Sequence, residues 1–267
     1  MPHIEVENGV EVFARDLGDG DPIVFLHGWL LSHRMFEYQY HSLLDEGFRC
    51  IGIDHRGYGE SDKPYGAYGY DRFADDLKTV LDELRLESVM LAGFSMGGGI
   101  ATRYMSRHDE AHIEKLALLA AASPCLTEKP DFPEGLDAEE LNPLIDEART
   151  DRGAMNAEFG EMLFHTDQSD ELMDRLWSIG MDASGQATAA SAEIFRDADL
   201  RPDMADITVP TRIYHGVHDE VTPFEITAEV LEDGIENAEL VRFENSGHGI
   251  IADETEKLNQ ELADFAG

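Results

Sequence analysis

One hydroxyl stands among small residues in the segment LAGFSMGGGI, residues 91–100. Ser95 is the centre of the pattern GFSMG, which separates a strand-like apolar run from a helix-like segment. A serine on a tight strand-to-helix turn has an unfavourable backbone conformation, and glycines two positions before and after it leave the room that the turn needs. The pattern predicts that Ser95 is a nucleophile. A glycine-rich phosphate loop is the competing interpretation, but the lysine of a P-loop is absent.

An acid and a histidine follow Ser95 at two later predicted strand ends. Asp219 stands in HGVHDEVTP after the run PTRIY, and His248 stands in NSGHG after the run AELVRFE. Loops beyond strand ends can aim an acid, an imidazole and a hydroxyl at one another although they are far apart in sequence. We predict that His248 accepts the proton of Ser95 and that Asp219 orients His248. Glu220 is the competing acid.

The segment LHGW ends an early predicted strand. We expect the backbone N–H groups of Trp29 and Met96 to form an oxyanion hole for a tetrahedral intermediate. His27, in the same segment, is expected to be structural. Although His215 and His218 lie near the acid, no further ligands are suitably placed, and we predict neither a metal nor a cofactor.

Strands and helices alternate along the chain in a way that would gather these residues. Two alternating strands surround Asn8-Gly9, a typical hairpin turn. Helix-like segments such as YDRFADDLKTVLDELRL separate short apolar runs typical of strands, which are PIVFLHG, RCIGIDHRG, SVMLAGFS, IEKLALLAA, PTRIYHG and AELVRFEN. Such strands are expected to be covered on both faces. The sequence predicts an α/β fold with a mostly parallel eight-stranded sheet and helices on both faces.

A long insertion interrupts this alternation. From Pro124 to about Arg201 there is no strand pattern, and the acidic segments are typical of amphipathic helices. A structureless loop of this length is improbable in a compact fold. We expect a helical cap over residues 124–205, divided at Pro143 and Gly153, inserted in a core formed by residues 1–123 and 206–267.

The chain is strongly acidic, with 56 Asp and Glu against 20 Lys and Arg and a net charge of -36. This negative charge repels nucleic acid and anionic membranes. It favours a halophilic protein, adapted to an ionic strength at which salt screens the repulsion among its own carboxylates. No export signal or spanning apolar run is visible, and two distant cysteines give no disulfide framework. We expect a cytoplasmic protein; a homo-oligomer is compatible with the sequence.

Several segments together resemble one family. HGW, DHRGYGESDKP, GFSMGGG, HGVHDEVTP and SGHG occur in the order seen in the α/β-hydrolase superfamily. HGWLLSHRMFEYQ and YDRFADDLKTVLDEL make the chain most similar to the cofactor-free haloperoxidase and esterase branch, also called perhydrolases. The resemblance implies a triad of Ser95, Asp219 and His248 that acts without metal or haem. The acidic cap matches no motif of that branch.

The sequence predicts a serine hydrolase that cleaves small carboxylic esters through an acyl-enzyme on Ser95, with perhydrolysis or halide oxidation as a side activity. A lactonase or C–C bond hydrolase with the same triad, or a receptor with negligible turnover, are the alternatives. Asp54 and Arg56 are expected to brace a loop, and Tyr58 and Tyr65 near it are expected either at the surface or in packing of the loop. Side chains expected to line the pocket are Trp29, Leu30, Phe94, Phe164 and Trp177.

Overall fold

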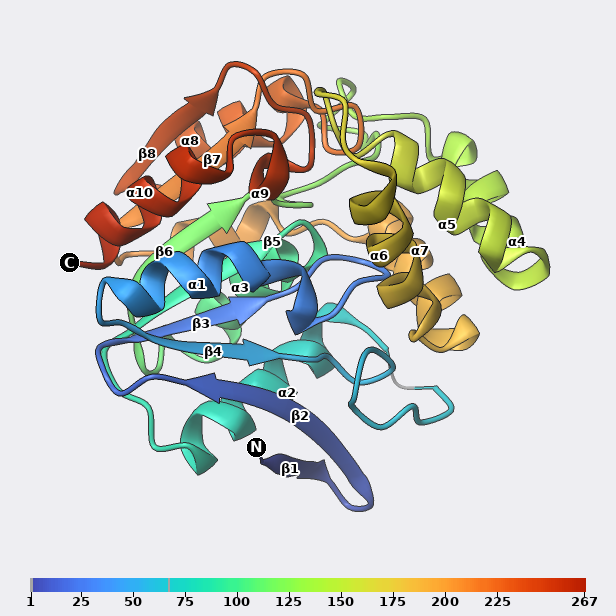
Figure 1. The fold of residues 1–267 in the computed structure, drawn as a ribbon. Coiled ribbons are helices and arrows are strands. Elements are labelled where there is room, and N and C mark those ends of the chain that lie inside the picture. The colour runs from blue at the N-terminus through green and yellow to red at the C-terminus, as the bar shows by residue number, and fades with distance from the viewer. Residues whose placement is uncertain (1, 67) are drawn as a thin grey trace.

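A twisted sheet forms the centre of the molecule in the computed structural model, which describes residues 2–66 and 68–267 (Figure 1). Across these residues eight strands form one sheet in the order β1-β2-β4-β3-β5-β6-β7-β8. The strands are β1 His3–Glu7, β2 Val10–Leu17, β3 Pro22–Leu26, β4 Arg49–Ile53, β5 Val89–Phe94, β6 Ile113–Leu119, β7 Thr211–Gly216 and β8 Ala238–Phe243. The hairpin strands β1 and β2 pair antiparallel, and β3 to β8 run parallel, so the predicted fold class is confirmed.

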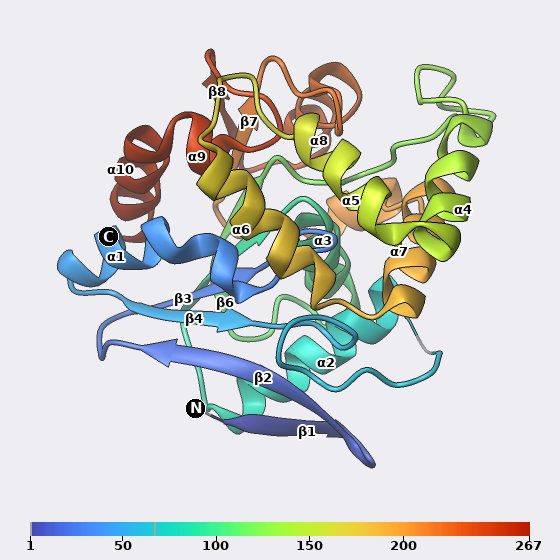
Figure 2. The same cartoon turned by 45° about the vertical axis from the view of Figure 1, so that its right-hand side comes forward.

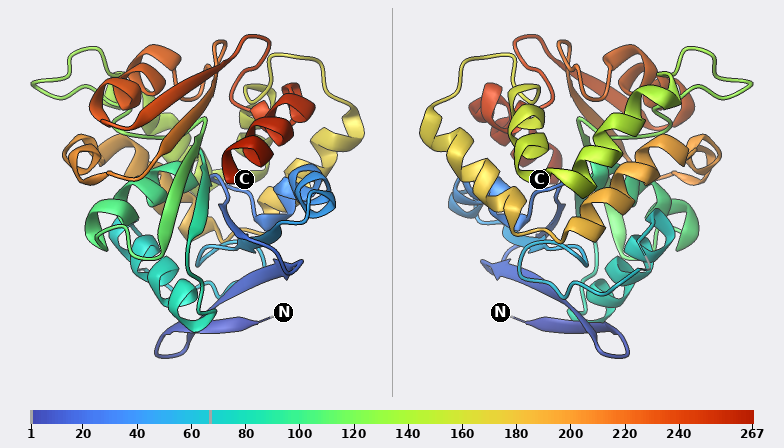
Figure 3. Two further views of the ribbon diagram at one scale, coloured as in Figure 1. Left: turned by 90° about the vertical axis from the view of Figure 1, so that its left-hand side faces the viewer. Right: turned by 90° about the vertical axis from the view of Figure 1, so that its right-hand side faces the viewer.

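Helices cover both faces of the sheet (Figure 3). Successive side chains of a strand point to opposite faces, and in β3 Ile23 and Phe25 pack with one apolar cluster whereas Val24 and Leu26 pack with another. The α-helices of the described residues are α1 Glu37–Asp45, α2 Tyr70–Glu83, α3 Met96–Arg107, α4 Asn142–Thr150, α5 Arg152–Glu161, α6 Asp170–Met181, α7 Gly185–Asp197, α8 Ala228–Gly234, α9 Ile250–Asp253 and α10 Thr255–Ala266. Helices α2 and α3 pack on one face, and α1 and α10 on the other.

Four helices, α4 to α7, lie between β6 and β7 in the chain and stand beside the carboxyl ends of the strands (Figure 2). Pro143 lies in the first turn of α4, as the sequence suggests. The break before α5 occurs at Asp151, whose side chain accepts a hydrogen bond from the N–H of Ala154, and Gly153 lies inside α5. An N-cap aspartate therefore divides these two helices, not the glycine.

Two aromatic side chains of the core hold helix α7. The indole N–H of Trp29 donates to the carbonyl of Thr188 at 2.9 Å, and the hydroxyl of Tyr58 donates to Ser191 Oγ at 2.8 Å. Tyr58 is fully buried, so of the two expected positions it packs within its loop and does not lie at the surface. Asp54 does brace its loop, because its carboxylate accepts the N–H of Glu60 at 2.8 Å.

Within the described residues, no helix combines the length and apolar character needed to cross a membrane.

Candidate active site

Ser95 occupies the turn between β5 and α3 with φ 51° and ψ −116°, a left-handed conformation that side-chain-bearing residues rarely adopt. The neighbouring glycines permit this turn. A Cβ atom on Gly93 would lie 2.4 Å from the carbonyl oxygen of Gly97, and one on Gly97 would lie 2.2 Å from that of Leu26. Such strain persists where the surroundings enforce it, commonly at functional sites.

Asp219 and His248 meet although 29 residues separate them. His248 Nδ1 lies 2.8 Å from Asp219 Oδ2, and both side chains are buried. The loops touch because Gly216 ends β7 without a side chain: a Cβ atom there would lie 2.1 Å from the carbonyl oxygen of Gly247. The ring of Phe94 packs against the imidazole of His248, with centroids 5.0 Å apart.

The carboxylate of Asp219 is held in its charged form. Burial acts to raise its pKa, but the nearby charge of His248 and hydrogen bonds from His215 and His248 outweigh burial and lower the pKa below its usual value. Since a carboxylate can only accept, His248 Nδ1 donates the proton between them. His248 Nε2 is then left as the proton acceptor of the ring.

The loop after β3 approaches Ser95 closely. A Cβ atom on Gly28 would lie 3.2 Å from Ser95 Cβ. Among residues 2–66 and 68–267, none accepts a hydrogen bond from the backbone N–H of Trp29 or of Met96. His27 fixes this loop, because its Nε2 accepts the N–H of His55 at 3.1 Å and its Nδ1 then donates to the Gly28 carbonyl at 2.8 Å.

Two cavities meet at Ser95. One, of about 320 Å³, also reaches His248, and the other, of about 290 Å³, extends toward Val221 and Thr222. Trp29 and Phe159 line both cavities, and their rings contact edge to face. Apolar surface predominates in both, and no Lys or Arg side chain among the described residues lines either of them. Five carboxylates do line them, Glu161, Asp170 and Asp174 in the first and Glu140 and Glu220 in the second.

Most of the residues expected to line the pocket do so. Trp29, Leu30, Phe94 and Trp177 line the larger cavity. Phe164 does not line either cavity at Ser95; it packs on Gly249, where an added Cβ atom would lie 2.2 Å from its ring. Sequence reasoning missed Phe159, which lines both cavities.

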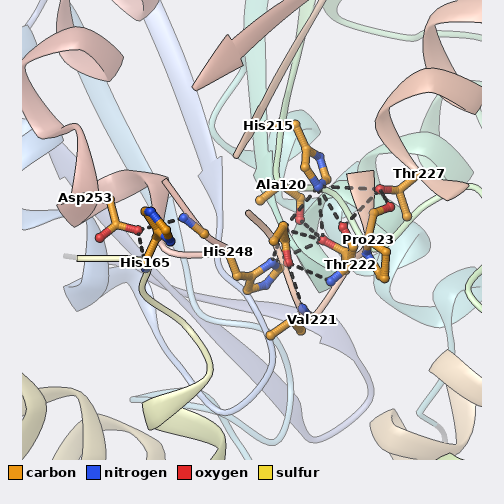
Figure 4. Close-up of polar contacts among 11 residues, drawn as sticks. Ala120, His165, His215, Val221, Thr222, Pro223, Thr227, His248 and Asp253 are labelled. Carbon is orange, nitrogen blue, oxygen red and sulfur yellow. Dashed lines mark hydrogen bonds and ion pairs between the residues drawn. The ribbon is translucent and has the colours of Figure 1, made fainter. Parts of the chain in front are cut away.

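Asp253 connects the loop of His248 with the chain between α5 and α6 (Figure 4). Its carboxylate accepts the N–H of Gly247 at 2.9 Å and the N–H groups of His165 and Thr166, each at 3.0 Å. One side chain therefore fixes both the histidine loop and a cap segment. Sequence reasoning missed this residue, because a single acid in the short helix α9 has no distinguishing pattern.

Glu220, the competing acid, is exposed and lines the smaller cavity, whereas Asp219 contacts the histidine. Over the described part of the chain, no group of three or more His, Cys, Asp or Glu side chains is arranged to hold a metal ion.

Comparison with known proteins agrees with this architecture. Residues 21–255 match the family described as alpha/beta hydrolase fold. The chain therefore belongs to the α/β-hydrolase family.

Its relatives include esterases and haloperoxidases. An AB hydrolase superfamily protein, YisY, of Bacillus subtilis is 46% identical over 264 residues, covering 99% of this chain and 98% of that protein. The non-heme chloroperoxidase CPO-A1 of Kitasatospora aureofaciens is 32% identical over 99% of both chains. The solved structure of an esterase from Exiguobacterium antarcticum is 42% identical, with a TM-score of 0.96 over 99% of this chain and 98% of its own.

Proposed function

We propose that this enzyme hydrolyses carboxylic esters through an acyl-enzyme on Ser95, with Asp219 and His248 completing a triad. One observation carries the proposal: the strained Ser95 turn opens into a cavity shared with His248, whose other ring nitrogen is held by Asp219. A serine with an adjacent base that a third group orients is the arrangement expected of an activated nucleophile. The esterase from Exiguobacterium antarcticum, similar over nearly the whole chain, supports the same reaction class.

In the proposed reaction, His248 Nε2 takes the proton of Ser95 Oγ as the oxygen attacks the ester carbonyl carbon. The unpaired N–H groups of Trp29 and Met96 stabilise the resulting oxyanion. The carbon–oxygen bond to the alcohol then breaks, and the alcohol leaves with the proton from His248. Water, deprotonated by His248, attacks the acyl carbon. The bond between this carbon and Ser95 Oγ then breaks, His248 returns the proton to Oγ, and the acid is released.

The paired cavities favour esters with an apolar group on each side of the carbonyl, because both open at Ser95. The carboxylates in their walls would repel a negatively charged acyl or alcohol group, and among the described residues no Lys or Arg lines either cavity to offset them. We therefore propose neutral esters as the substrate class. A lactonase or C–C bond hydrolase of carboxylate-bearing substrates is disfavoured by the same charges.

A phosphonate that mimics the tetrahedral intermediate tests the nucleophile directly. We expect one phosphonate per chain on Ser95, found by mass spectrometry of peptides, and steady-state turnover of short neutral p-nitrophenyl esters. Ser95→Ala should lower kcat by at least about 1000-fold while leaving the melting temperature nearly unchanged. Labelling elsewhere would contradict the assignment of Ser95, and product release that stops after one equivalent would favour a receptor.

Perhydrolysis is a second candidate, favoured by the non-heme chloroperoxidase among the relatives. Hydrogen peroxide would replace water as the nucleophile at the acyl-enzyme, and the peracid product would oxidise halide in solution. The ester assay repeated with peroxide and bromide tests this. Halide oxidation that continued in Ser95→Ala would rule it out.

A further inference from the structure

Asp219 receives more hydrogen bonds than its contact with His248 requires. Its Oδ1 accepts the backbone N–H groups of Val221 and Thr222, each at 2.8 Å. Its Oδ2 accepts from His248 Nδ1 and from Thr222 Oγ1, each at 2.8 Å, and lies 3.1 Å from His215 Nε2. The oxygen that faces His248 therefore also accepts from the Thr222 hydroxyl and lies at ion-pair distance from His215 Nε2. Neither of these two groups takes part in the proposed proton transfer, and Figure 4 shows the side chains of His215, Thr222 and His248 close together.

The tautomer of His215 follows from its contacts. His215 Nε2 lies 2.8 Å from the carbonyl oxygen of Thr222, which can only accept, so Nε2 carries a proton. The same nitrogen lies 3.1 Å from Asp219 Oδ2. The other nitrogen, Nδ1, is buried and has no hydrogen-bond partner among the described residues. All polar contacts of this buried ring are therefore on the side of Asp219 and of the loop that follows it.

A purely structural role explains these contacts less well. A buried imidazole that only filled space could be replaced by an apolar side chain, since the unpaired Nδ1 costs free energy without a compensating bond. His215 stands four residues before Asp219, at the end of β7, where the strand anchors it. Its ring is further fixed by an edge-to-face contact with Phe224, with centroids 5.7 Å apart.

From this geometry we infer that His215 and the Thr222 hydroxyl are positioning residues, which hold Asp219 Oδ2 in line with His248 Nδ1. The inference rests on the proposed function of the triad. When His248 becomes an imidazolium, the contact between Nδ1 and Oδ2 must persist, and a carboxylate held by two further donors cannot rotate away from it. Charge-assisted hydrogen bonds of this kind are directional as well as strong.

The test compares His215→Leu, which removes the donor, with His215→Gln, whose side-chain amide can donate from about the same place. Hydrogen bonds to a charged group correspond to about 10- to 100-fold in rate. We expect His215→Leu to lower kcat by that factor with KM within about twofold, and His215→Gln to recover most of it. Thr222→Val should change kcat in the same direction.

Thr227→Val is the matched control. Thr227 is equally buried and its hydroxyl lies 3.5 Å from His215 Nε2, but it donates to the Pro223 carbonyl and does not contact Asp219. We expect kcat of this variant to stay within about twofold of the wild type. Urea unfolding of every variant separates loss of activity from loss of fold.

The proton between His248 Nδ1 and Asp219 gives a second readout, as a downfield resonance in the proton NMR spectrum that requires no substrate. We expect His215→Leu to shift or broaden it and His215→Gln to restore it. A His215→Leu variant with the wild-type kcat and resonance would overturn the inference, as would equal losses of kcat in Leu and Gln variants with an unmoved resonance. A wild-type protein that shows the resonance but cleaves no ester would instead refute the proposed function.

Discussion

His27 and His55 bury their imidazoles against each other beside the loop that carries Trp29, with ring centroids 4.1 Å apart. Burial lowers the pKa of His27 to about 4, although the charge of Asp54 acts in the opposite direction. His55 is also buried, and its pKa is lowered for the same reason. Both rings therefore stay neutral in the folded protein at pH values where the unfolded chain has already bound protons.

This difference predicts that acid destabilises the fold through His27. The unfolded chain binds the proton more tightly, so the contribution is fully present above about pH 6.5 and is lost as the pH falls toward 4. The loss amounts to about 3 kcal/mol. We expect the free energy of unfolding, measured by urea titration, to fall between pH 7 and pH 4 by about 3 kcal/mol less in His27→Gln than in the wild type.

His41→Gln is the control for that titration, because the side chain of His41 is 85% exposed. Its pH dependence should run parallel to that of the wild type. A His27→Gln curve that is also parallel would mean that His27 is not held neutral by the fold.

At the residue scale, sequence reasoning identified the candidate nucleophile, base and acid, because their chain order and glycine neighbours leave few alternatives. It considered His215 only as a metal ligand. The structure instead turns this ring toward Asp219, and the spacing of four residues in HGVHD was the available signal. The direction of a side chain at a strand end depends on the path of the following loop, which no local pattern specifies.

The cap meets the histidine loop through Asp253 and through a backbone hydrogen bond from the Gly249 N–H to the Leu163 carbonyl. Thr166 Oγ1 and Gln168 Nε2 also donate to this carboxylate. Its Oδ2 is shared between the loop and the cap segment, whereas its Oδ1 accepts only from the cap segment. Asp253→Asn replaces one acceptor oxygen by a donor, which cannot accept an N–H group. The segment and the loop should therefore separate locally without global unfolding.

We expect Asp253→Asn to lower kcat about tenfold, because each charge-assisted hydrogen bond contributes on the order of 1.5 kcal/mol or more to the position of the loop. Hydrogen exchange measured by mass spectrometry should quicken in residues 163–168 and 246–249. Asp264→Asn, on the exposed side of α10, removes a carboxylate that binds only Gln260 among the described residues and should change neither quantity. Faster exchange spread over the whole chain would indicate general destabilisation instead.

The strands and helices were largely predictable, because each buried strand is a short apolar run and the apolar residues of each helix recur with the helical period. The two strands of the hairpin at Asn8-Gly9 are present in the structure, and each of the six apolar runs contains one of the strands β3 to β8. What the sequence could not supply is how α4 to α7 lie on the core. That arrangement depends on contacts such as Tyr58 with Ser191, which join residues 133 positions apart.

Over the whole molecule the basic side chains are too few to neutralise the acidic ones, and some arginines contact more than one carboxylate. Arg103 contacts both Asp71 and Asp203, and Arg107 contacts both Asp71 and Asp75. The remaining carboxylates repel one another, and salt weakens this repulsion because the screening length falls from about 10 Å at 0.1 M to about 3 Å at 1 M. The halophilic character expected from the sequence stays a prediction.

We predict that the melting temperature rises by roughly 10 °C or more between 0.1 and 2 M KCl, as the repulsion among the carboxylates is screened. Differential scanning calorimetry measures this. A variant carrying Glu83→Gln, Glu114→Gln and Glu232→Gln, three exposed acids, should melt higher at low salt and respond less to KCl. A melting temperature independent of KCl in both proteins would contradict the prediction.

The direct pairing of β6 with β7 bears on how this protein can evolve. Leu116 faces Thr211 in the sheet, and the register continues without interruption although the cap helices are inserted between the two strands. The proposed nucleophile, acid and base, which are Ser95, Asp219 and His248, belong to the core, whereas Phe159, Met173 and Trp177 of the cavity walls come from the insertion. Mutations in the insertion can therefore alter which molecules enter while the reactive groups descend unchanged, so substrate choice and chemistry can evolve as separate traits of one gene.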